Sequence, residues 1–131
     1  MDIVLVDTSV WINFFKANET TSSLFLKNNL SNIVIATCPV IVQEVLQGIV
    51  SDKDFRYINS YLNTLTRLIE NSYELAEEAA KLYRELRKKG VTARKPNDCL
   101  IATYAIRNNI ALLQDDKDFR LIAQHSKLKI I

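Results

Sequence analysis

The chain has 131 residues, of which 48% are hydrophobic and 24% are charged, with 17 lysines and arginines against 15 aspartates and glutamates. This composition can fill the core of one domain, and it excludes a disordered or collagen-like chain. No apolar run reaches the length of a membrane span, and the first residues lack the pattern of a secretion signal. We therefore expect a single domain over residues 1–131, in the cytoplasm and without a membrane partner.

Short apolar strands alternate with helices along the whole chain. Ile3 to Val6 is a continuous apolar run rich in β-branched residues, typical of a strand buried on both faces. Pro39 and Pro96 each suit the first position of a helix, and Gly90 suits a helix end. In chain order, we expect a strand over 3–6, a helix capped by Thr8 or Ser9, a helix over 19–30, a strand over 33–36, a helix over 39–50, a helix beginning at Ser51, a strand over 67–69, a helix from Asn71 to Gly90, a helix over 96–108, a strand over 110–113, a helix over 117–126 and a strand over 128–131.

This alternation predicts an α/β domain with a mainly parallel sheet. Right-handed crossovers place the carboxyl ends of all parallel strands at one edge of the sheet. Ligands of open α/β sheets bind at that edge. Residues that directly follow strands are therefore the first candidates for a functional site.

Three aspartates directly follow predicted strands. Asp7 comes after the first strand, and Asp115 and Asp116 come after the strand over 110–113. All three should lie at the carboxyl edge. Taken alone, each has an ordinary alternative as a turn or helix-capping residue.

Asp98 falls in the first turn of the helix that Pro96 opens, where an acid can simply complement the helix dipole. It shares a helical stripe with three apolar residues, Ile101, Ala102 and Ala105. If this stripe packs on the sheet, the Asp98 carboxylate points inward over the sheet edge. An inward carboxylate needs a partner.

Glu44 lies on the helix that begins at Pro39. At about 100° per residue, it shares a face with Gln43, Gln47 and Gly48. This face has no lysine or arginine, so it suits a pocket wall, although a solvated helix face is the ordinary alternative.

Together the four acids predict a metal centre. Carboxylates that converge within a few ångströms repel one another, at a cost on the order of a few kcal/mol for each close pair. A bound cation removes this repulsion, and oxygen ligands select hard divalent ions, here Mg²⁺ or Mn²⁺. In the absence of an ion, at least one of the carboxyls should have a raised pKa.

In order and spacing, these residues resemble those of the PIN-domain nucleases, and in particular the VapC-type toxins of toxin–antitoxin modules. The resemblance covers the whole chain and depends on the four acids together rather than on any single motif. The segments that carry it are Asp7-Thr8-Ser9, Glu44, Pro96-Asn97-Asp98 and Asp116-Lys117-Asp118-Phe119.

The resemblance implies a three-layer α/β/α fold with a five-strand parallel sheet in the order 3-2-1-4-5. That order places the strands before Asp7 and Asp116 side by side. The family's acidic quartet maps onto Asp7, Glu44, Asp98 and Asp116. Asp118 matches a further acid of the family, and Ser9 a hydroxyl beside the first aspartate.

We therefore expect a Mg²⁺- or Mn²⁺-dependent endoribonuclease in which Asp7, Asp98 and Asp116 hold the metal. Glu44 has two roles open to it, as a ligand of a second ion or as a general base. The adjacent Arg94 and Lys95 are placed to contact substrate phosphates. If the chain is a toxin, the resemblance further implies an antitoxin partner and a homodimer.

Two other functions are compatible with the sequence. One is a non-catalytic PIN-like module that binds RNA or protein. The other is a different metal-dependent phosphoesterase, although Ser9 stands where phospho-aspartate enzymes carry a second aspartate.

Overall fold

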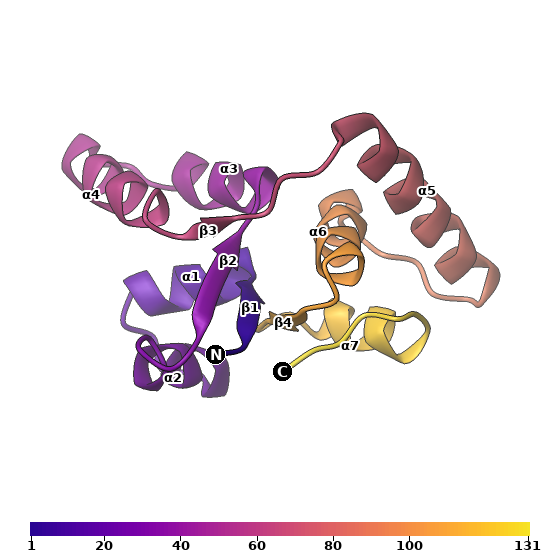
Figure 1. The fold of residues 1–131 in the computed structure, drawn as a ribbon, viewed down its shortest axis with the longest axis horizontal. Helices are drawn as coiled ribbons and strands as arrows, with labels where there is room; N and C mark the ends of the chain where they lie inside the picture. The colour runs from indigo at the N-terminus through magenta and orange to yellow at the C-terminus, as the bar shows by residue number, and fades with distance from the viewer.

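A parallel sheet lies between groups of helices in the computed structural model, which describes residues 1–131 (Figure 1). In that view α1 and α2 lie on one side of the strands and α6 and α7 on the other, as the three-layer prediction requires. The elements are β1 (Ile3–Val6), α1 (Thr8–Phe15), α2 (Thr21–Asn28), β2 (Val34–Thr37), α3 (Pro39–Gln47), α4 (Asp52–Leu62), β3 (Thr66–Arg67), α5 (Ser72–Lys88), α6 (Pro96–Arg107), β4 (Ala111–Leu113) and α7 (Lys117–Gln124).

The sheet confirms the predicted α/β class and most of the predicted topology. Its strand order is β3-β2-β1-β4, and every pair is parallel. Val6 is opposite Leu113, and the Asp7 N–H donates to the Leu113 carbonyl at 2.9 Å. The loops that follow β1 and β4 are therefore neighbours at the carboxyl edge.

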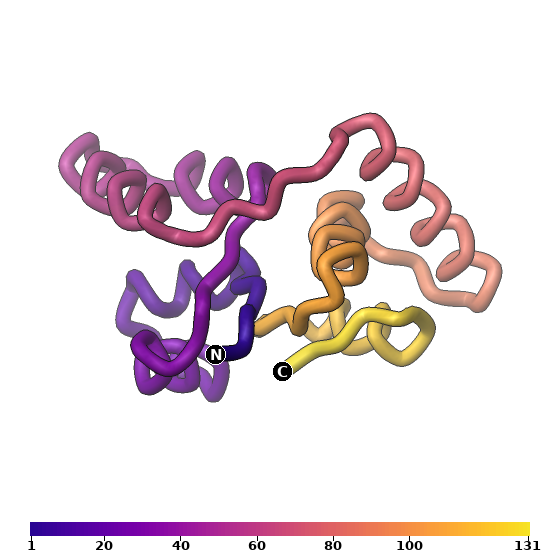
Figure 2. Tube along the Cα trace, in the orientation of Figure 1, coloured from indigo at the N-terminus to yellow at the C-terminus, as the bar shows by residue number.

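The prediction of a fifth strand over 128–131 was wrong. This segment runs beside β4 but forms only one isolated parallel bridge, between Leu112 and Ile130. A strand would need further bonds, from the Lys129 N–H to the Ile110 carbonyl or from the Gln114 N–H to the Ile131 carbonyl, and neither is formed. The Leu128 N–H instead donates to the Ser126 Oγ at 3.2 Å, within the bend that follows α7. The tube in Figure 2 shows the last residues approaching the strands near the N-terminus.

Local chemistry sets the helix starts. Ser51 and Asn71 accept hydrogen bonds from the first turns of α4 and α5, as N-caps do. The predicted cap of α1 was wrong: neither Thr8 nor Ser9 but Asp7 caps it, by accepting the Ser9 N–H. The helix beginning at Asn71 ends before Gly90, whose φ of +81° is left-handed.

One hydrophobic core joins the sheet to the helices and holds both loops of the carboxyl edge. Leu5 of β1, Trp11 of α1 and Phe119 of α7 are fully buried in it. Cys38 and Cys99 are also buried, as free thiols. No helix combines the length and the apolar character that crossing a membrane requires.

Candidate metal centre

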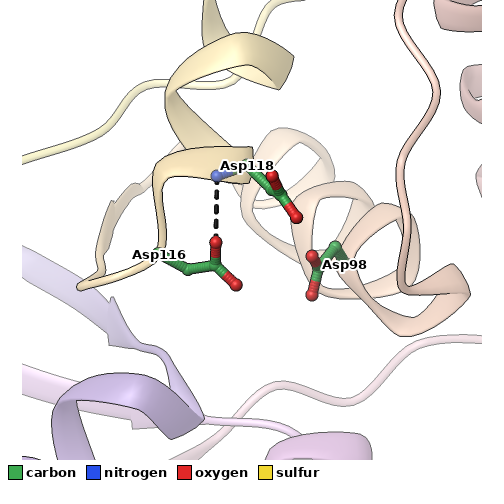
Figure 3. A group of neighbouring side chains, drawn as sticks. All are labelled: Asp98, Asp116 and Asp118. Atoms are coloured by element: carbon green, nitrogen blue, oxygen red, sulfur yellow. Dashed lines mark hydrogen bonds between the residues drawn. The ribbon is translucent and has the colours of Figure 1, made fainter.

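Three carboxylates converge at the carboxyl edge, from the start of α6 and the start of α7. Oxygen atoms of Asp98, Asp116 and Asp118 all lie within 4.8 Å of one another. Figure 3 shows the three side chains turned toward a common space between the two helices. We call these three residues the acidic trio.

Asp98 is the most buried member of the acidic trio, with 5% of its surface exposed. The apolar stripe predicted to carry it inward is buried as expected, since Ile101, Ala102 and Ala105 all lie in the core. The Asp98 Oδ2 atom is buried and accepts no hydrogen bond. Burial, followed by repulsion from Asp7 and Asp116, raises the pKa of Asp98 to about 7.

Asp116 is the N-cap of α7. Its Oδ1 accepts the Asp118 N–H at 2.9 Å, and its Oδ2 lies 3.2 Å from the Lys95 Nζ. Burial opposes ionisation of Asp116, but these two hydrogen bonds and the Lys95 charge outweigh it and lower the pKa. Asp116 is therefore ionised beside a carboxyl that resists ionisation.

Asp118 completes the acidic trio from the first turn of α7. Its Oδ1 lies 3.4 Å from the Arg94 Nη2, and its side chain is mostly covered. Arg94 and Lys95 thus lie beside the acidic residues, as predicted, and each pairs with one member of the trio.

Asp7 lies close to the acidic trio without belonging to it. Its carboxylate is buried and accepts two bonds from Ser9, at 3.0 Å from the backbone N–H and 2.6 Å from the hydroxyl. Burial raises the Asp7 pKa; the Ser9 bonds oppose this shift and the Glu44 charge adds to it. Asp7 in turn raises the pKa of Asp98, so the two carboxyls share one electrostatic environment.

Glu44 is held at the side of this centre by hydrogen bonds to both of its oxygens. Thr8 Oγ1 donates to Oε1 at 2.7 Å, and Asn97 Nδ2 donates to Oε2 at 3.4 Å. These partners come from the first residues of α1 and α6, which also carry Asp7 and Asp98. The predicted pocket-wall position of Glu44 is consistent with this placement.

Asp115 points away from the acidic trio, although it directly precedes Asp116. Its Oδ2 accepts Asn13 Nδ2 at 2.9 Å and Thr20 Oγ1 at 2.7 Å. Its backbone N–H donates to the Ser9 hydroxyl at 3.0 Å. Asp115 therefore ties the loop after β4 to α1 and α2.

Several polar residues of the site were missed at the sequence level. Thr8 and Asn97 orient Glu44, Asn13 holds Asp115, and the buried Gln114 accepts the Asp116 N–H at 2.8 Å. Nothing in their spacing distinguishes them from ordinary loop and helix residues. Only their proximity to Asp7 and Asp98 in the motif segments could have drawn attention to Thr8 and Asn97.

The donor set of this centre fits a hard divalent cation. All available ligand atoms are carboxylate oxygens, the type that Mg²⁺ and Mn²⁺ prefer. The unpartnered Asp98 Oδ2 is the atom that most requires a positive partner. Both observations favour a metal site over a purely structural acidic cluster.

Comparison with known proteins gives the same family as the sequence motifs. The family model for the PIN domain matches residues 4–124. Two curated relatives, the VapC ribonuclease Mb1587 of Mycobacterium bovis and ribonuclease VapC11 of Mycobacterium tuberculosis, are each 33% identical over 129 residues, covering 97% of this chain and 96% of the relative. These matches confirm the family resemblance.

Solved structures share the fold at lower identity. VapBC2 from Rickettsia felis, bound to a DNA fragment from its promoter, superposes with a TM-score of 0.76 at 20% identity, over 98% of this chain and 97% of that one. VapBC-1 from nontypeable Haemophilus influenzae gives 0.75 at 21%, over 98% and 96%.

Proposed function

Because the chain belongs to the PIN-domain family, and within it to the VapC ribonucleases, we propose that it is an endoribonuclease that hydrolyses RNA phosphodiester bonds with Mg²⁺ or Mn²⁺. The observation that carries the proposal is the buried Asp98 Oδ2, which has no partner among three converging carboxylates. A protein keeps such an atom at a cost to its stability, and a catalytic cation explains that cost.

Asp98 and Asp116 are the first proposed ligands of the ion, with Asp7 and Asp118 completing the set. When bound, the ion would supply an activated water and stabilise charge on the phosphate oxygens. Ser9 holds Asp7 through its hydroxyl and its N–H, so the Asp7 carboxylate keeps one orientation. Lys95 and Arg94, 65% and 70% exposed, would meet the substrate phosphates.

Glu44 is the proposed general base. Thr8 and Asn97 fix its carboxylate while leaving lone pairs on both oxygens to accept a water proton. The alternative role, as a ligand of a second ion, predicts that Glu44→Gln lowers the number of Mn²⁺ ions bound. If Glu44 is instead a general base, Glu44→Gln should leave metal binding unchanged and abolish cleavage.

An RNA cleavage assay with and without Mg²⁺ or Mn²⁺ tests the proposed activity. We expect cleavage only with the metal, and a loss of at least about a hundredfold in Asp7→Asn and Asp98→Asn. Asp2→Asn is the matched control, because Asp2 is exposed and precedes β1, at the opposite end of that strand from Asp7. If both site variants cut RNA as fast as the control, the proposed function is wrong. Sequencing of RNA 5′ ends after induced expression would identify the target.

An apolar groove beside Glu44 is the proposed binding site of an antitoxin. The groove has a volume of about 510 Å³ between α1, α3 and α4, and Glu44 is one of its lining residues. A partner segment lying there would contact Glu44 directly. The apolar residues that line it are Ile12, Phe15, Val45, Ile49, Val50 and Ile58.

Co-expression and co-purification with a candidate antitoxin test this pairing. The structural neighbours from Rickettsia felis and Haemophilus influenzae are VapBC complexes, which supports an antitoxin partner here. We expect Val50→Asp to weaken the complex, since Val50 is 99% exposed and its substitution should leave the fold intact. The homodimer remains a prediction, tested by mass in solution, and the cytoplasm is the expected compartment of an RNA-cleaving toxin.

A further inference from the structure

The two oxygens of Asp116 have different partners. Oδ1 accepts the Asp118 N–H as part of the helix cap, so it is committed to the start of α7. Oδ2 is the Asp116 oxygen that remains available to a cation between the three carboxylates. The same atom lies 3.2 Å from Lys95 Nζ. A cation bound to Asp116 through this oxygen would therefore lie close to the Lys95 ammonium.

Arg94 stands in the same relation to Asp118. Its Nη2 lies 3.4 Å from Asp118 Oδ1, and the guanidinium is far more exposed than the carboxylate. Both basic side chains approach from the solvent side, from the residues just before α6. No pair of this kind reaches Asp98 Oδ2.

An ammonium and a divalent cation on the same carboxylate oxygen repel each other. A carboxylate oxygen has enough lone pairs to bind both the ammonium and the metal ion. The two compete because their positive charges repel each other. Lys95 and Arg94 are long, exposed side chains that can swing away at little cost, whereas the carboxylates are mostly covered. The basic residues are therefore the partners that move.

We infer that Lys95 and Arg94 are exchangeable counterions of the acidic trio, which leave Asp116 and Asp118 when a divalent cation binds and thereby become free to hold substrate phosphates. The inference rests on the metal centre of the proposed function and adds a role in substrate capture. It couples the two ligands: the metal releases the groups that bind the phosphodiester, so phosphate binding strengthens when the metal is present.

Mn²⁺ affinity, measured by titration calorimetry at physiological salt, gives the first test. Lys95→Ala should tighten Mn²⁺ binding about two- to fivefold, the range of an exposed ion pair that no longer has to be broken. Lys117→Ala is the matched control, because Lys117 is an exposed lysine between Asp116 and Asp118 that pairs with neither. Equal effects of the two variants would show a general charge effect and overturn the inference.

Nuclear magnetic resonance of lysine side chains reports the exchange directly. The Lys95 Nζ signal, assigned by its loss in Lys95→Ala, should shift when Mg²⁺ is added, and the Lys117 signal should not. An unmoved Lys95 signal at saturating Mg²⁺ would overturn the inference.

Binding of a short labelled oligothymidylate, followed by fluorescence anisotropy, tests the phosphate half. With Mg²⁺, the slope of log affinity against log salt should be lower in Lys95→Ala than in the parent by about 0.7, the value for one lost contact to a single strand. Without Mg²⁺, the two slopes should agree. A slope difference that does not depend on Mg²⁺ would contradict the release of Lys95.

None of these measurements depends on cleavage. A protein that passes them but cuts no RNA keeps the counterion exchange and loses the proposed function. A protein that cuts RNA, but in which Lys95→Ala behaves like Lys117→Ala, keeps the function and loses the exchange.

Discussion

Asp98→Asn should stabilise the protein in the absence of metal while removing metal binding. The parent buries the Asp98 carboxylate beside Asp7 and Asp116, and burial and their charges raise its pKa to about 7 from the usual 3.8. An asparagine has nearly the same shape and no charge. Its amide can also donate a hydrogen bond to a neighbouring carboxylate.

The size of the effect follows from the pKa. The unfolded chain loses the Asp98 proton near pH 4 and the folded protein near pH 7, so the folded state binds more protons between these values. Stability therefore falls as pH rises through this window and levels off above about pH 7. A shift of this size corresponds to an upper limit of about 4 kcal/mol, and solvent access from the Lys95 side reduces it to on the order of 2–3 kcal/mol.

Thermal unfolding in a chelating buffer measures the prediction. At about pH 8, Asp98→Asn should melt roughly 6–12 °C above the parent, at about 3–4 °C per kcal/mol for a domain of this length. Below about pH 3 the difference should vanish, because the parent Asp98 is then protonated in both states. Adding Mn²⁺ should raise the parent's melting temperature and leave the variant unchanged. A variant no more stable than the parent at pH 8, or equally stabilised at both pH values, would refute the reasoning.

Three further predictions follow from the same contacts. Mn²⁺ affinity should rise with pH and level off above about pH 7, since Asp98 must lose its proton to bind; calorimetry at several pH values checks this. Ser9→Ala should lower the free energy of unfolding by about 1–3 kcal/mol in urea titrations, because it removes the hydroxyl that donates to Asp7 and leaves a backbone N–H unpaired. Burial raises the thiol pKa values of Cys38 and Cys99 to about 12 and about 11, so both should react with a thiol reagent only after unfolding.

The placement of the acids on one edge was readable from the sequence. Asp7 and Asp116 follow parallel strands, and parallel strands joined by helices must bring their carboxyl ends together. Asp98 was expected to point inward because its neighbours on the helix are apolar, and hydrophobic burial carries them into the core. These arguments use only local pattern and chain topology.

The choice among Asp115, Asp116 and Asp118 was decided by tertiary contacts. Asp115 and Asp116 follow the same strand, but Asn13 and Thr20, some hundred residues earlier in the chain, draw the Asp115 carboxylate to the other side. No local sequence pattern predicts contacts between residues so far apart in the chain.

By itself the sequence determined the class of fold, the edge that carries the acids and the kind of ion they suit. The tertiary structure alone decided that Asp118 joins Asp98 and Asp116, that Lys95 and Arg94 neutralise two of the three, and that the segment after α7 forms a bridge instead of a strand. The physical reason is the same in each case. Hydrophobic periodicity is a local property that can be seen in the sequence. A hydrogen bond or an ion pair between distant residues depends on which groups the folded chain brings within reach of each other.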